Sequence, residues 1–154
     1  MIMTSVIQTA QYILSKRSLL TTMGLERLTF FSQCRYCALY ASLLYPEKSY
    51  KRPTSPVSYE LMALHAGKYL ASAHAIGTYG GGLKDAEKES CDWVMANFGG
   101  GLWRQCREWN LTGHGEEITM EDIKRIAALL LPSTPPAKLK GQLLNGSTLF
   151  WGCN

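Results

Sequence analysis

The chain has 154 residues, and its 46% hydrophobic and 18% charged content suits one globular domain with a single core. Its net charge of +4 is spread over separate Lys and Arg pairs, which excludes the dense basic stripe of a dedicated nucleic-acid binder. No segment reaches the roughly 18 uninterrupted apolar residues that cross a bilayer, and no secretory signal pattern is present. We therefore expect a cytoplasmic protein with no membrane partner.

The first two predicted helices cover residues 5–16 and 23–44, where apolar side chains recur at helical spacing. Ser or Thr precedes each helix, at positions 4–5 and 21–22, and can accept hydrogen bonds from the free N–H groups of the first turn. Pro46 ends the second helix, because proline cannot continue the hydrogen-bond pattern.

The following stretch is polar, basic and rich in proline, so residues 46–55 are expected to form an exposed loop or an edge strand. Ser55 and Pro56 have the order of an N-cap and a first helical residue. They predict a third helix over residues 56–73, with Tyr69 among its inward positions.

Three further helices are predicted over residues 85–98, 102–109 and 120–131. The last has the clearest start signal, since Thr119 and Asp122 form a variant of the capping box. Together the elements predict a mainly α fold, a compact single-domain bundle of about six helices with at most a small β element.

The helical domain is expected to cover residues 1–131, and residues 132–154 form a C-terminal extension that begins with PSTPP. Leu149, Phe150 and Trp151 in this extension need burial. We therefore expect the extension to pack on the domain or on a partner.

Two cysteines three apart, Cys34 and Cys37, would suit half of a zinc site or a redox pair. A zinc site needs a second pair of ligands at short spacing, and the remaining Cys and His residues are scattered. A reactive thiol pair belongs at a helix N-terminus, whereas these residues lie inside a helical pattern. Both cysteines are therefore interpreted as packing residues, and no metal or other cofactor is expected.

Two other segments have weaker chemical signals. The glycine-rich GTYGGGLKD, residues 77–85, lacks the Lys-Ser/Thr ending of a phosphate-binding loop and is interpreted as a connection between helices. His114 lies between glycines near two glutamates, so it is a conceivable general base, but an exposed loop histidine is the simpler interpretation. No spacing indicates a catalytic triad or a carboxylate pair, so the sequence does not predict an enzyme.

Tryptophan, tyrosine and arginine are the residue types that dominate the energy of protein interfaces. Trp and Arg alternate in LWRQCREW, residues 102–109. This pattern suits a protein interface, and it equally suits the stacking of nucleic-acid bases.

The opening segment, AQYILSKRSLLTTMGLERLTFFSQCRYCALYASLLYPEKSYKRPTSPVSYEL, resembles the Panacea domain of SocA-like antitoxins. Members begin with a short helix and continue with a threonine-started helix of leucines, an aromatic pair, a small residue and glutamine, followed by leucine-tyrosine. The corresponding residues here are Thr22, Leu25, Leu28, Phe30, Phe31, Ser32, Gln33, Leu39 and Tyr40. The family's proline-valine step after an aromatic residue is similar to Tyr50, Pro56 and Val57, with Tyr59 close behind, although Ser55 replaces the usual glycine.

The resemblance covers roughly residues 6–130 and implies a non-enzymatic antitoxin that neutralises a toxin or another effector by direct contact. Family-like residues that do not fit an apolar core stripe are the expected binding residues: Gln33, Tyr50, Pro56, Val57 and Tyr59. Gln33 has an alternative role, which is to hold the loop of residues 55–59 in place.

Three other functions stay open at this point. A phage-encoded inhibitor of a host defence protein would need the same kind of surface. A nucleic-acid-binding module would use the Trp and Arg residues of 102–109. A thiol or zinc protein would use Cys34 and Cys37.

Overall fold

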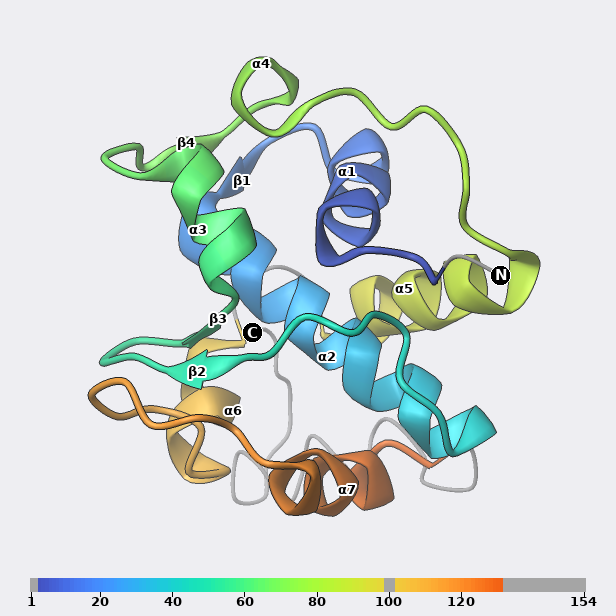
Figure 1. The fold of residues 1–154 in the computed structure, drawn as a ribbon, viewed down its shortest axis with the longest axis vertical. Helices are drawn as coiled ribbons and strands as arrows, with labels where there is room; N and C mark the ends of the chain where they lie inside the picture. The colour runs from blue at the N-terminus through green and yellow to red at the C-terminus, as the bar shows by residue number, and fades with distance from the viewer. Residues whose placement is uncertain (1–2, 99–101, 132–154) are drawn as a thin grey trace.

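The computed structural model describes residues 3–98 and 102–131 (Figure 1). The elements in chain order are α1 (Val6–Lys16), β1 (Leu20–Thr21), α2 (Thr22–Tyr40), β2 (Tyr50–Lys51), β3 (Pro56–Val57), α3 (Tyr59–His65), β4 (Leu70–Ala71), α4 (Ala73–Ile76), α5 (Asp85–Phe98), α6 (Trp103–Glu108) and α7 (Met120–Leu129). The fold is mainly α, as predicted. In the described part of the chain, its β structure consists of two antiparallel two-stranded ladders, β1 with β4 and β2 with β3.

Helix α2 runs through the centre of the molecule, with α1, α3, α5 and α7 packed around it (Figure 1). Leu25, Leu28 and Phe31 are fully buried, and burial of each such side chain contributes about 1.5–3 kcal/mol. The helix is buried on nearly all sides, which is typical of a core helix. Its buried polar side chains therefore need partners inside the protein.

The predicted helix starts are confirmed at three positions. Ser5 caps α1 in a capping box with Gln8, and Thr21 caps α2 by accepting a hydrogen bond from the Gly24 N–H. Thr119 and Asp122 form the predicted capping box of α7. Each cap pairs backbone N–H groups that the helix itself leaves free.

The predicted third helix is wrong at both ends. Pro56 does not start it, because residues 56–57 are extended and pair with β2, and the N-cap is Ser58. The helix ends at His65, and the chain then turns through Gly67 at a φ of +76° into β4. Tyr69 lies just before this strand and is 77% exposed, so its predicted inward position is also wrong.

Helix α2 ends four residues earlier than predicted, at Tyr40, because Ala41 adopts a left-handed conformation with a φ of +53°. Glycine is favoured at this place in a helix end, since a Cβ atom makes the left-handed region costly. We expect Ala41→Gly to raise the free energy of unfolding by about 1 kcal/mol, measured by urea denaturation. The matched control is Ala38→Gly one turn earlier, which should instead lower it by about 0.5–1 kcal/mol. Equal losses for both variants would contradict the role of Ala41.

None of the described helices is long and apolar enough to cross a membrane. The C-terminal extension of residues 132–154, including Leu149, Phe150 and Trp151, lies outside the described residues.

Candidate protein-binding site

The hairpin of β2 and β3 positions most of the predicted binding residues. Tyr50 pairs with Val57 and Lys51 with Pro56 in an antiparallel register, and the Arg52 N–H donates to the Ser55 carbonyl across the turn at 3.1 Å. The sequence RPTS suits this turn, because proline fixes its backbone angle and cannot extend a central strand.

A third segment, residues 112–118, runs along the other side of β2 (Figure 1). The Lys51 N–H donates to the Glu116 carbonyl at 2.8 Å, and the Gly115 N–H donates to the Lys51 carbonyl at 2.7 Å. The Ile118 N–H donates to the Ser49 carbonyl at 2.8 Å just before α7 begins. Strand β2 is therefore held on both sides, by β3 and by residues 112–118, although it is only two residues long.

The aromatic rings of Tyr50 and Tyr59 stack face to face, with centroids 4.3 Å apart and an angle of 10° between the planes. Tyr59 is the first residue of α3, and it takes this place because the Ser58 hydroxyl caps the helix by accepting from the Leu61 N–H at 3.2 Å. Tyr59 is 40% exposed and Tyr50 is half-buried. The pair thus presents a fixed aromatic face to solvent.

Cationic side chains flank this aromatic pair. Alternate residues of an extended chain point to the same side, which places Lys48 and Arg52 on the side of Tyr50 and Lys51 on the other. Lys48 forms an exposed ion pair with Glu117 at 3.5 Å. We use the name hairpin surface for the four residues Lys48, Tyr50, Arg52 and Tyr59.

Pro56 and Val57, also predicted to bind, are buried in the hairpin, with Val57 opposite Tyr50 and Pro56 opposite Lys51 in the register. Four of the five predicted residues therefore come together at the hairpin, and Gln33 is the exception. Gln33 is 2% exposed and lies in the middle of α2.

The Gln33 side chain holds the chain that follows α2. Its Oε1 accepts from the N–H groups of Leu44 at 2.6 Å and Tyr45 at 3.1 Å, and its Nε2 donates to the Tyr45 carbonyl at 3.1 Å. The alternative role predicted for Gln33, contact with residues 55–59, is thus wrong in its target, because the bonds go to residues 44–45.

Glu26 and His65 perform the role that was expected of Gln33. Glu26 Oε1 accepts from the Ser58 N–H at 3.1 Å, and its Oε2 lies 2.8 Å from Nε2 of His65. Both side chains are buried. Burial raises the pKa of Glu26, although the hydrogen bonds from His65 and Ser58 act in the opposite direction.

Arg27, next to Glu26 on α2, fixes the other end of β3. Its Nη2 donates to the Thr54 carbonyl at 3.1 Å. Two consecutive polar residues of the core helix thus hold the segment that carries the hairpin surface. Sequence reasoning missed the roles of Glu26, Arg27 and His65, and the available signal for the first two was the pair of adjacent charges in the apolar helix, in GLERL at residues 24–28.

The cysteines are confirmed as packing residues within the described part of the chain, where Cys34, Cys37, Cys91 and Cys106 are free and buried. Burial raises the pKa of Cys91 and of Cys106 to about 12, and it raises that of Cys34 well above the ordinary value. A high pKa removes the thiolate that a nucleophile or metal ligand needs. Residues 3–98 and 102–131 contain no group of three or more His, Cys, Asp or Glu side chains that could hold a metal ion.

His114 is an exposed loop residue, as the simpler interpretation predicted, and its N–H donates to the Glu116 carboxylate at 2.6 Å. This bond and the backbone hydrogen bond of Glu116 itself hold the pKa of Glu116 below its ordinary value. These hydrogen bonds give the loop a structural explanation.

No protein-family model matches the chain, and neither curated proteins nor solved structures include a similar one. The resemblance to the Panacea domain therefore stays a prediction.

Proposed function

We propose that this protein is an antitoxin-like, non-enzymatic binding protein that masks a toxin or another effector in the cytoplasm through the hairpin surface. One observation supports the proposal most. Residues selected from the sequence for their resemblance to Panacea antitoxins converge in the fold on one stacked and solvent-facing aromatic pair, Tyr50 and Tyr59.

The composition of the hairpin surface suits protein recognition. Tyrosine offers a large contact area with little conformational freedom to lose, and arginine adds directional hydrogen bonds. The backbone beneath is pre-organised, because Glu26 and Arg27 bond both ends of β3. Pre-organisation lowers the entropy lost on binding.

A phage-encoded inhibitor of a host defence protein would use the same surface in the same way. The two roles differ only in the partner protein. An experiment with the product of the neighbouring gene can therefore distinguish them. Co-expression with that product should restore growth if it is toxic, and the two proteins should co-purify. An unaffected toxicity and no complex would contradict the antitoxin role.

Nucleic-acid binding is supported by one feature of α6. Trp103 is 47% exposed, and the Arg107 guanidinium lies 4.8 Å from the centre of its ring. The second tryptophan of this segment, Trp109, is instead buried against Phe31, with ring centroids 5.6 Å apart. Retention on heparin that falls steeply with added salt would favour this alternative.

Substitution of one aromatic residue tests the hairpin surface directly. We expect Tyr59→Ala to weaken the affinity for the co-purified partner about ten-fold or more, because truncation of a central aromatic contact removes much of an interface's energy. The measurement is isothermal titration calorimetry. Tyr69→Ala is the matched control, since Tyr69 is even more exposed but precedes β4. Equal affinities for the two variants would contradict this surface.

A further inference from the structure

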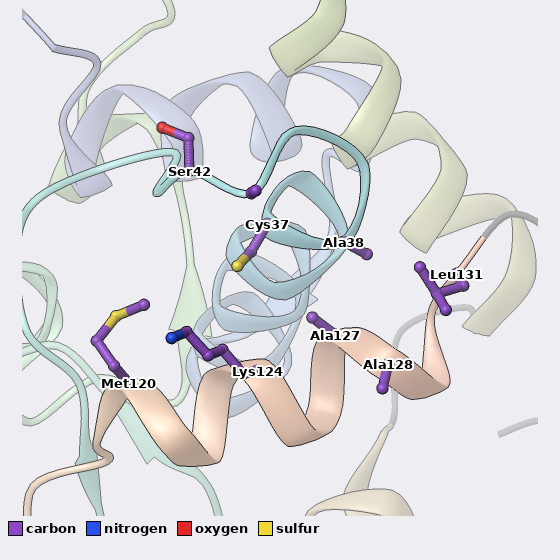
Figure 2. A pocket seen from close by; sticks show the side chains of 9 residues that line it. Cys37, Ala38, Ser42, Met120, Lys124, Ala127, Ala128 and Leu131 are labelled. Carbon is purple, nitrogen blue, oxygen red and sulfur yellow. The ribbon is translucent and has the colours of Figure 1, made fainter.

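An apolar groove lies between the end of α2 and helix α7, and none of the residues that line it belongs to the hairpin surface (Figure 2). Its volume is about 360 Å³. Ala38 and Ala41 line it from the α2 side, and Met120, Lys124, Ala128 and Leu131 line it from the side of α7. Figure 2 shows the Cys37 side chain pointing from α2 toward α7 across the groove.

Helix α7 has a second apolar face beside the one that packs in the core. Ile123 and Ile126 are buried against the domain, whereas Met120 and Leu131 are 40% and 39% exposed at the two ends of the groove. Residues 120, 124 and 128 repeat at intervals of four, so they share one side of the helix, and Leu131 lies two residues beyond the helix end. From residue 120 to residue 128 this side is about 12 Å long, which is just over two helical turns.

Lys124 is the charged side chain in the lining of this groove. Within residues 3–98 and 102–131, no carboxylate lies within 4.0 Å of the Lys124 ammonium group, the distance that defines an ion pair. The ion pair on the same helix joins Arg125 to Asp122 at 3.3 Å, and it leaves Lys124 available. A partner that fills the groove would cover part of this exposed side chain, and a carboxylate opposite Lys124 would offset the cost of removing its charge from water.

We propose that the groove binds an amphipathic α-helix of a protein partner, which inserts apolar side chains along α7 and places an Asp or Glu carboxylate against Lys124. Helices commonly dock in this way, with anchor residues about one turn apart. The net charge of +4 on the whole chain also favours an acidic partner. The inference shares no residue with the hairpin surface, so it stands independently of the proposed function.

The chain's own extension is the other nearby source of apolar side chains. Residues 132–154 contain Lys138 and Lys140 but no Asp or Glu. This segment would bring further positive charge to Lys124 instead of a counter-charge. Charge complementarity therefore favours a separate acidic helix.

The test uses two fluorescein-labelled amphipathic peptides of about 15 residues, which is about four helical turns. Their apolar faces are identical, and a central residue is Glu in one peptide and Gln in the other. Fluorescence anisotropy with the full-length protein should show about five- to ten-fold tighter binding of the Glu peptide. Lys124→Met should remove this preference, while the control Lys68→Met at an exposed site should keep it.

Ala128→Trp fills the groove and should abolish binding of both peptides, with circular dichroism to show that the helices remain. Equal binding of the two peptides to the unmodified protein, or none, would overturn the proposal. Binding that appears only after Leu149, Phe150 and Trp151 are all changed to Ser would assign the groove to the chain's own extension instead. Conversion of a dimer to a monomer by Ala128→Trp would assign it to a second copy.

Discussion

Gln33→Leu should lower the free energy of unfolding by about 3–5 kcal/mol, a large fraction of the roughly 5–15 kcal/mol that stabilises a typical domain. The volume of the side chain changes little, so the effect comes from hydrogen bonds. The N–H groups of Leu44 and Tyr45 and the Tyr45 carbonyl would all lose their partner in the core. Each buried backbone group left without a partner costs about 1–3 kcal/mol.

Chemical denaturation measures this loss, and Gln11→Leu is its control. Gln11 is half-buried and donates one hydrogen bond, from Nε2 to the Ile76 carbonyl at 3.0 Å. Gln11→Leu should therefore lower the free energy of unfolding by about 1 kcal/mol. Similar losses for the two variants would mean that Gln33 does not hold residues 44–45 as the geometry indicates.

The sequence predicted those parts of the fold that depend on neighbouring residues. The caps at Ser5, Thr21 and Thr119 could be placed because a cap and its partner lie within three residues. The prediction of the third helix was wrong because its start depends on residues that lie outside the helix. Ser55-Pro56 and Ser58-Tyr59 offer two similar local starts, and the choice between them depends on the pairing of β3 with β2, which no local pattern encodes.

In the candidate site too, the sequence indicated individual residues but not the contacts between them. Tyr50 and Tyr59 were selected from a resemblance in segment order, but their stacking follows from the hairpin register and the start of α3. Glu26 and His65 are 39 positions apart, so the spacing of residues along a helix does not predict that their side chains meet. A charged residue in an apolar helix signals that a partner exists, but only the tertiary fold identifies it.

Glu26→Ala should lower the free energy of unfolding by about 2–4 kcal/mol, because it leaves the Ser58 N–H and the His65 imidazole without their shared acceptor in the core. The loss would also free the start of α3, and with it Tyr59 of the hairpin surface. Glu60→Ala is the matched control, since Glu60 lies on the exposed side of the same helix and should change stability little.

Glu26→Gln separates the charge of this side chain from its hydrogen bonds, because the amide can still accept from Ser58 and donate to His65. Burial raises the pKa of Glu26 in the folded state. Between its ordinary pKa and this raised value, the folded protein therefore binds more protons than the unfolded chain, and the contribution of Glu26 to stability falls as pH rises. Urea denaturation across this acid-to-neutral range should show that the stability of the unmodified protein, relative to Glu26→Gln, declines with increasing pH. A relative stability that rises with pH would mean that the attraction of His65 outweighs burial in setting the Glu26 pKa, and that the pair holds α3 as an ion pair.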